Sequence, residues 1–372
     1  MRKTYRIGAN SYQWNYFCVT PLNNNTTISW QLSGRGASLA PNLTMEYSTD
    51  RLTWHNYTAG TDITTSVPVY FKGNNSSLAN LVQTDARTWW YYKLVSDNYI
   101  DLSGQLRSLV KPTYTENELS CNITSAGLGW PGNISIFSDN TYIHSVKDLI
   151  IDLTIGTIYK DGRYKGSYTL AGLFRGCSAL IDTPIFANNV SAIPAPGTLD
   201  YLYAEMFKDC TSLVNVYTLP ILNTYTGRYT FQSMFEECTS LAIPPKLPAT
   251  TLSEGCYRQM FRGCISLTEL PQLPATILPD NCYKYMFWIN DYMNVSNPTG
   301  NTYIILSTQQ RLGAGIHNTP YEFKIPYNAT GSTTGTDSTL GMFERDTAFT
   351  ETAVQTPALN TIYYCSLPTA SD

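Results

Sequence analysis

The sequence predicts a mainly β protein in two parts, a β-sandwich at the front and a stacked repeat behind it. Three observations support this prediction. Short alternating runs, separated by turn residues, fill the first 110 residues. No long helical period occurs in that region. After residue 172, a short unit containing Phe, Cys and Leu recurs at spacings of 26 to 33 residues, as stacked repeat proteins require.

The composition is typical of an extracellular or virion-like β protein. Charged residues make up 14% of the 372 residues, and the formal net charge is −4. Average soluble proteins contain roughly 25% charged residues. Nucleic-acid binding is not expected, because neutralising phosphates needs clustered Lys and Arg. Hydrophobic residues make up 43% of the chain, which excludes a disordered protein.

Residues 1–110 predict a small β-sandwich domain. Turn residues such as those at 23–25 and 73–75 separate short runs in which apolar and polar side chains alternate. The alternating runs lie at 26–32, 43–47, 67–72 and 89–95.

Residues 111–172 predict a connecting segment that caps the repeats. Lys111 and Pro112 break the preceding strand, and residues 127–132 have the Gly, Trp and Pro content of a loop. Residues 147–159 are apolar enough for a buried strand.

A repeated unit is the most informative feature of the sequence. LFRGCSAL at 173–180 recurs as MFKDCTSL at 206–213, MFEECTSL at 234–241 and MFRGCISL at 260–267. Such a unit cannot bury its apolar face alone, whereas stacked units bury Leu, Met, Phe and Cys as columns. The period and the leucine content therefore indicate an irregular leucine-rich-repeat (α/β) solenoid with short helices.

Each repeat is expected to contain one strand, as at 267–273, and one helical turn or short helix, as at 280–287. The repeats are placed at 173–300. Residues 301–372 contain one more degenerate unit, at 342–349, and are expected to form a C-terminal cap.

At these motifs the sequence resembles the BspA-like leucine-rich-repeat family, whose units have the form L-P-A-T-T-L-x-x-x-C-Y-x-x-M-F-x-G-C-T-S-L-T. Residues 247–267 fit this form closely, with LPATTL, CY, MF and GC in register. The front region, with MEYSTD at 45–50, is similar to the β-domain that precedes such repeats. The resemblance is weaker over 111–172 and 301–372.

Proteins of this layout occur on the surfaces of gut anaerobic bacteria and in virions of phages that infect them, including crAss-like phages. Bacterial members usually carry a secretion or lipoprotein signal, and the N-terminal sequence here has no apolar h-region. The resemblance therefore implies a non-catalytic phage virion surface protein, of the head or tail fibre/decoration type, assembled in the host cytoplasm. Its function would be contact with the host cell surface.

The implied partners are other virion proteins and a bacterial surface glycan or protein, with no nucleic acid and no membrane insertion. Homo-oligomerisation is left open. Two alternatives also stay open. The protein would be a purely structural decoration or connector protein of the virion, or else an adhesin on the bacterial cell surface.

Outward-facing positions of the predicted strands form the candidate ligand-binding surface. Aligning the units places Thr218, Lys246 and Gln272 in one column, and Tyr217 begins the next column with Pro245 and Pro271. Solenoids often bind ligands on their concave side. A polar column with little charge suits a glycan better than nucleic acid, and an ordinary solvated face is the alternative interpretation. The candidate ligand-binding residues are Tyr217, Thr218, Lys246, Glu269 and Gln272.

No catalytic residue, metal ligand or cofactor is expected. The nine cysteines are an odd number and form no CxxC pair, which argues against a complete disulfide framework and a zinc site. The repeated cysteines are expected to be small buried hydrophobic side chains. The three histidines lie in separate contexts, and no nucleophile-elbow, zinc-protease or phosphate-binding motif occurs.

Overall fold

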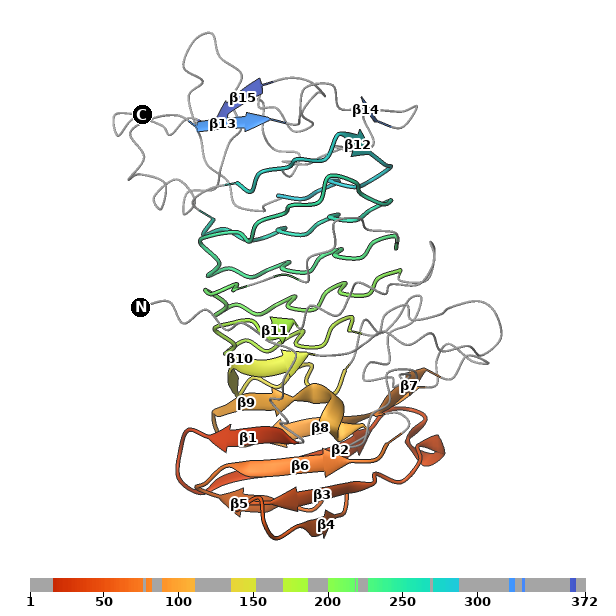
Figure 1. Cartoon of the computed structure of the whole chain (residues 1–372), viewed down its shortest axis with the longest axis vertical. Coiled ribbons are helices and arrows are strands. Elements are labelled where there is room, and N and C mark those ends of the chain that lie inside the picture. The colour runs from red at the N-terminus through yellow and green to blue at the C-terminus, as the bar shows by residue number, and fades with distance from the viewer. Residues whose placement is uncertain are drawn as a thin grey trace.

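The computed structural model shows a mainly β protein with almost no helix, which confirms the β-rich prediction. Two sheets lie at one end of an elongated molecule, and successive passes of the chain are stacked above them (Figure 1). The structure describes residues 16–75, 78–81, 89–110, 135–151, 170–186, 200–217, 219, 227–267 and 270–287, and the strand backbone at 321–324, 330–331 and 362–365.

The seven-stranded sheet contains, in spatial order, β11 (Ile185–Phe186), β10 (Ile143–Ile151), β9 (Ile100–Gln105), β1 (Phe17–Pro21), β6 (Val69–Gly73), β3 (Met45–Ser48) and β4 (His55–Tyr57). The four-stranded sheet contains β5 (Ile63–Thr65), β2 (Thr26–Ser33), β8 (Trp89–Ser96) and β7 (Ala79–Leu81). Further short elements are the 3-10 turns η1 (Ala37–Leu39) and η2 (Leu106–Leu109) and the strands β12 (Ile277–Leu278), β13 (Tyr321–Lys324), β14 (Thr330–Gly331) and β15 (Ile362–Cys365).

The two sheets pack face to face around Trp30 of β2. Its ring meets Phe71 of β6 and Phe17 of β1 edge to face, each at a centroid distance of 6.0 Å. The backbone N–H of Trp30 donates to the hydroxyl of Tyr57, which in turn donates to the carbonyl of Thr61. Because one sheet supplies Trp30 and the other supplies its neighbours, the core lies between the sheets.

The seven-stranded sheet continues into the part of the chain that precedes the repeats. Strand β10 pairs in parallel with β9, and β11 pairs in parallel with β10. The sheet therefore passes without a break from the predicted first domain, over the predicted connecting segment, to the first repeat. A single hydrophobic core follows the same path.

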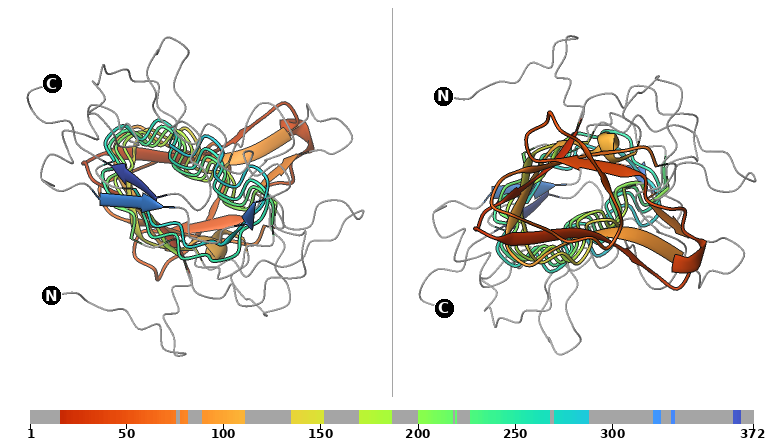
Figure 2. Two further views of the ribbon diagram at one scale, coloured as in Figure 1. Left: turned by 90° about the horizontal axis from the view of Figure 1, so that it is seen from above. Right: turned by 90° about the horizontal axis from the view of Figure 1, so that it is seen from below.

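Beyond β10 the chain forms coils that lie over one another when seen along the long axis (Figure 2). Backbone bonds join neighbouring coils: Phe207 donates its N–H to the carbonyl of Met234 at 2.9 Å, and Phe235 donates to Met260 at 3.0 Å. The residues in between donate to a carbonyl three positions back, as Met234 does to Phe231. These turn segments lie at 170–176, 200–209, 228–237, 254–263 and 280–287.

The helix expected at 280–287 is not formed, and this prediction was wrong. Asn281 and Tyr285 have φ angles of 59° and 55°, which a right-handed helix does not admit. Every fourth residue of the other turn segments has the same left-handed conformation, as in Tyr201, Glu205 and Asp209. Alternate N–H groups bond to the next coil instead of four residues back, so each segment becomes a run of turns.

The strand expected at 267–273 is also absent over its described residues, 267 and 270–273. Pro271 and Pro274 supply no N–H for a ladder. The nearest strand is the two-residue β12, and it pairs with β14.

Seven stacked phenylalanine rings run through the core along the long axis, and we call this column the phenyl ladder. Consecutive centroids are 5.5 to 5.7 Å apart, with planes within 16° of parallel. The ladder begins in β1, so it ties the stacked coils to the sheets. Its members are Phe17, Phe137, Phe174, Phe207, Phe235, Phe261 and Phe287.

The repeated cysteines form a second buried column. Four of these thiols donate a hydrogen bond to the carbonyl of the phenylalanine one coil earlier, as Cys238 does to Phe207 at 3.1 Å. Burial raises the pKa of these thiols, to about 12 for Cys177. The expectation that they are small buried side chains is confirmed for the six repeated cysteines, and Cys18 of β1 is buried as well.

One repeat precedes the first one found in the sequence. Residues 136–143, IFSDNTYI, place Phe137 in the phenyl ladder and Asp139 in the left-handed conformation of the equivalent Gly176. Asn140 takes the place of cysteine and donates its side-chain N–H to the carbonyl of Leu94. This unit was not recognised in the sequence because Asn140 replaces the cysteine of the repeated motif.

Candidate binding surface

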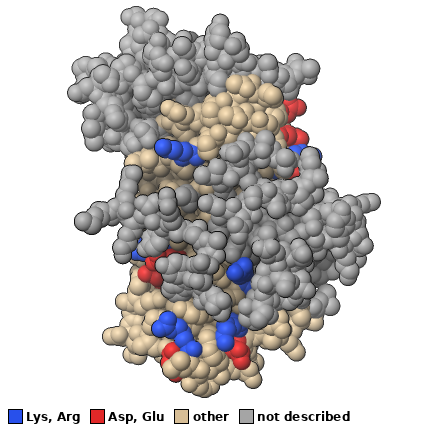
Figure 3. All heavy atoms as spheres, in the orientation of Figure 1, with Lys and Arg blue, Asp and Glu red and all other residues tan. Residues whose placement is uncertain are grey.

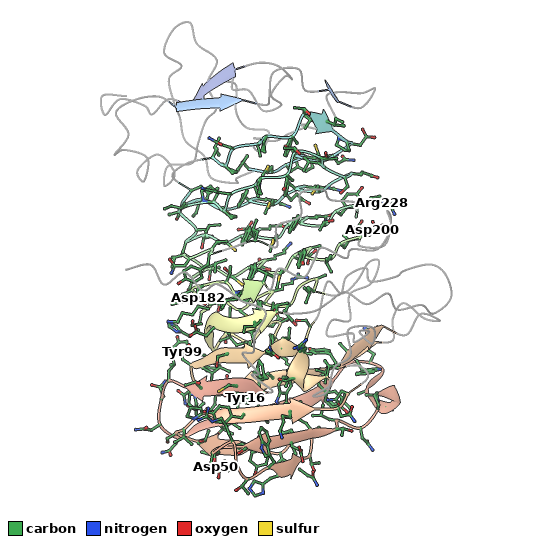
Figure 4. All side chains as sticks on the ribbon, viewed as in Figure 1. Tyr16, Asp50, Tyr99, Asp182, Asp200 and Arg228 are labelled. Carbon is green, nitrogen blue, oxygen red and sulfur yellow. The ribbon has the colours of Figure 1, made fainter. Side chains whose placement is uncertain are left out.

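The segments that follow each repeated cysteine make up one side of the stacked coils. We call the outer surface of residues 181–186, 211–217, 239–252 and 270–278 the extended face. Coils lie side by side here as well, because Ile181 donates its N–H to the carbonyl of His144 and Val214 donates to Ile181, at 3.0 and 3.2 Å. Figure 4 shows Tyr99 and Asp182 near one edge of the stacked coils, and Asp200 and Arg228 near the opposite edge.

Three of the five predicted ligand-binding residues are described, and all three are exposed on the extended face. Lys246 and Gln272 each precede a buried leucine of successive coils. Tyr217 lies on the coil before and is 58% exposed. The structure thus brings these three side chains to one surface. Thr218 and Glu269 lie outside the described residues.

The predicted column of Tyr217, Pro245 and Pro271 is not uniform. Both prolines are buried, whereas Tyr217 faces solvent. The backbone N–H of Tyr217 bonds to the hydroxyl of Thr183 on the preceding coil at 3.1 Å. Tyr217 is therefore the aromatic group of this surface, and the prolines belong to the interior.

Sequence reasoning missed three apolar residues of the extended face. Val214 is 45% exposed, Ile243 is 63% exposed and Ile277 is 56% exposed. Strict alternation from the buried Leu241 would have turned Ile243 inward, but the following Pro244 and Pro245 are both buried, so alternation fails here. The position of Ile243 directly before two prolines was the feature of the sequence that could have indicated its exposure.

A buried carboxylate joins the first coils beneath the extended face. Asp182 is 2% exposed, and its two oxygens accept the N–H of Val146 at 2.7 Å and the hydroxyl of Ser145 at 2.6 Å. Burial raises the pKa of Asp182 above its ordinary value. Because both oxygens are used inside the protein, this group holds the coils together and is not available to a ligand.

The opposite side of the coils, formed by the turn segments, carries paired charges. Glu236 is nearly buried and bridges Lys208 at 3.0 Å and Arg262 at 3.3 Å on the two neighbouring coils. Arg228 forks onto Asp200 at 2.8 and 3.1 Å. These side chains form ion pairs between neighbouring coils, so their charges stabilise the stack and are not left for a ligand.

The extended face has far fewer charges. Lys246 is the only exposed charged residue of its described segments. In the view of Figure 3, uncharged side chains dominate the described surface as well, and charged groups are scattered. A surface with Tyr, Ile and Val around one Lys and one Gln suits contact with a neutral partner.

Among the described residues, no group of three or more His, Cys, Asp or Glu side chains could hold a metal ion. The described part of the chain also has no helix long and apolar enough to span a membrane. No protein-family model matches the chain, and no match is found among curated proteins or solved structures.

Proposed function

We propose that the protein is a non-catalytic surface protein of a phage virion that contacts the bacterial host through the extended face. In this proposal the front is a β-sandwich and the stacked coils are an irregular leucine-rich-repeat solenoid. The virion assignment rests on the resemblance of residues 247–267 to the BspA-like repeats. The exposure of Tyr217 and Ile243 on consecutive coils carries the binding assignment.

The physical argument starts from solvent exposure. Tyr217 and Ile243 keep large apolar surfaces in water, and covering such surfaces is favourable at about 25 cal/mol per Å². The phenyl ladder fixes the coils behind them, so little entropy is lost on binding. A tyrosine also offers contact area with few rotatable bonds. Single contacts would be weak, and many copies on one particle would provide avidity.

The test is a titration of the full chain, biotinylated and held on streptavidin tetramers, onto gut anaerobic bacteria. The double variant Tyr217→Ala/Ile243→Ser removes the apolar centre of the extended face. We expect saturable binding by the wild type and a loss of at least about tenfold in the variant. Leu52→Ser is the matched control, because Leu52 is 86% exposed in the connection between β3 and β4 and is not part of the extended face. Equal binding by the double variant would contradict the proposal.

A decoration or connector protein of the virion is the second candidate function. The exposed Val214 and Ile243 favour it, because a neighbouring virion protein would cover them in the assembled particle. Under this alternative, the double variant fails to enter particles, and the isolated wild type does not bind cells. A bacterial adhesin would instead be found on bacterial cells carrying no phage.

A further inference from the structure

Four side chains at the lower end of the extended face form a cluster that the core does not explain. We call Tyr99, Asp101, Tyr142 and His144 the aromatic corner. Asp101 lies in β9 and His144 lies in β10, and Tyr99 and Tyr142 directly precede these two strands. Ile100 donates its N–H to the carbonyl of Tyr142 at 2.9 Å, which holds the two strand starts together.

The rings of the aromatic corner are open to solvent. Tyr99 meets Tyr142 at 5.9 Å and 68°, and it meets His144 at 6.2 Å and 61°. Tyr99 is 47% exposed and Tyr142 is 39% exposed. In the phenyl ladder, by contrast, an interior ring such as Phe207 is covered on both faces and fully buried. Rings at steep angles leave ring surface uncovered, so the corner offers aromatic faces to a ligand.

The polar side chains of the aromatic corner are oriented by one contact and still have hydrogen-bonding atoms available. The Nδ1 atom of His144 lies 3.2 Å from one carboxylate oxygen of Asp101, which orients the imidazole. Both side chains are more than a third exposed. Within the described structure, no hydrogen bond reaches the Nε2 atom of His144, the second oxygen of Asp101 or the hydroxyls of Tyr99 and Tyr142. Four hydrogen-bonding groups therefore surround the open rings.

We propose that the aromatic corner binds one sugar ring of a bacterial surface glycan. A pyranose has an apolar C–H face, which can cover an exposed tyrosine ring, and a rim of hydroxyls. Those hydroxyls can donate to Asp101 and bond to Nε2 of His144. Few oriented polar groups around an apolar surface are the usual composition of a small-ligand site.

Other ligand classes fit less well. An anionic ligand would meet the carboxylate of Asp101 directly. A cation would find a single carboxylate that already interacts with His144. A neutral, hydroxyl-rich ligand uses both the aromatic faces and the unpaired polar groups. This inference rests on the proposed function and names the ligand class of that contact.

The corner is continuous with the extended face. The backbone bonds from Ile181 to His144 and from Val214 to Ile181 place these three residues on successive rungs. A glycan held at the corner can thus run toward the exposed Val214 on the same side of the molecule. The two surfaces remain separable by mutation, because the corner and Tyr217 belong to different segments.

The test uses saturation-transfer NMR on the full chain with four probes: N-acetylglucosamine and the methyl glycosides of galactose, mannose and rhamnose. We expect saturable transfer to the C–H protons of at least one sugar, with a Kd on the order of millimolar. Tyr99→Ala should weaken it at least about tenfold, whereas Tyr99→Phe, which keeps the ring, should bind within about threefold of the wild type. Leu52→Ser is the matched control, because Leu52 is 86% exposed and belongs to neither binding surface, and it should leave the signal unchanged.

Two results would overturn the inference: no saturable transfer to any of the four sugars, or transfer that Tyr99→Ala and Tyr142→Ala leave unchanged. Cell binding separates this outcome from failure of the proposed function. If the chain binds cells but none of the sugars, the corner assignment fails and the proposed function stands. Periodate oxidation of cell glycans should abolish binding to cells, and binding that survives it would assign the contact to a protein.

Discussion

Replacing Phe207 by leucine removes one ring from the middle of the phenyl ladder but keeps the site filled with an apolar side chain. Phe207 is fully buried. Its ring stacks on Phe174 and on Phe235, each at 5.6 Å and with planes within 6° of parallel. Leucine preserves most of the hydrophobic burial, so the substitution mainly removes two aromatic contacts.

Each aromatic pair contributes about 0.5–1.5 kcal/mol beyond its area burial. Two lost pairs therefore predict a decrease of about 1–3 kcal/mol in the free energy of unfolding. Phe207→Ala also opens a cavity and should cost about 3–5 kcal/mol. Leu52→Ala, at an exposed site, should stay within about 0.5 kcal/mol of the wild type.

The assay is urea denaturation followed by circular dichroism and tryptophan fluorescence, with the slope of the transition compared between variants. Coincident transitions by the two probes are needed, because stacked repeats do not always unfold in one step. The reasoning is refuted if Phe207→Leu unfolds at the wild-type urea concentration with an unchanged slope. Stacking of Phe207 on its two neighbours would then contribute nothing measurable to the free energy of unfolding.

Three further predictions concern the coils. Asp182 has a pKa raised by burial, so the stability it contributes is present below its unfolded pKa of 3.8 and is lost as pH rises through the higher folded pKa. Asp182→Asn should remove this dependence, so the variant should gain stability relative to the wild type between pH 4 and neutral pH in denaturation measurements. A parallel pH dependence of both proteins would contradict this assignment. A Cβ added at Gly255 would clash with the ring of Tyr229, and the φ angle of +60° at this position favours glycine. Gly255→Ala should cost at least about 2 kcal/mol in the wild type but only about 1 kcal/mol with Tyr229→Ala, and equal costs in a double-mutant cycle would argue against the contact. The described cysteines are buried with raised thiol pKa values. A variant with Cys121→Ser and Cys365→Ser should thus react with a thiol reagent only on unfolding, and rapid labelling of the native variant would be inconsistent with the buried column.

Local patterns were sufficient for the parts of the fold that local chemistry determines. Alternation predicted strands where β2, β3, β6 and β8 are found. The recurring Met-Phe, Cys and Leu predicted buried columns, and the structure buries all of them in its described coils. In each case the side chain itself prefers the interior, so a single repeat already contains the information.

The conformation of the turn segments was not accessible in the same way. Residues such as Tyr201, Glu205 and Ser233 occupy the left-handed region, which their side chains do not favour. Hydrogen bonds to a coil more than 20 residues away impose it, as from Glu205 to Gln232. No propensity within one repeat indicates such a bond, so the segment was predicted as a helix.

The binding surface was found only in part for a related reason. The exposed Lys246 and Gln272 follow from repeat alignment, but their role as ligand-binding residues stays a prediction. Tyr99 and Tyr142 are 43 residues apart in the sequence and meet because β9 and β10 pair in parallel. Neither residue has a neighbouring motif, so only the tertiary arrangement reveals the aromatic corner.

The most direct test of the proposed host contact compares one copy of the full chain with four copies on a streptavidin tetramer, titrated onto gut anaerobic bacteria. We expect saturable binding by the tetramer, tighter than that of the single copy by about 10²–10⁴-fold, because linked weak sites add avidity. Absence of saturable binding by the tetramer to every strain, with the protein folded, would contradict a role in host contact.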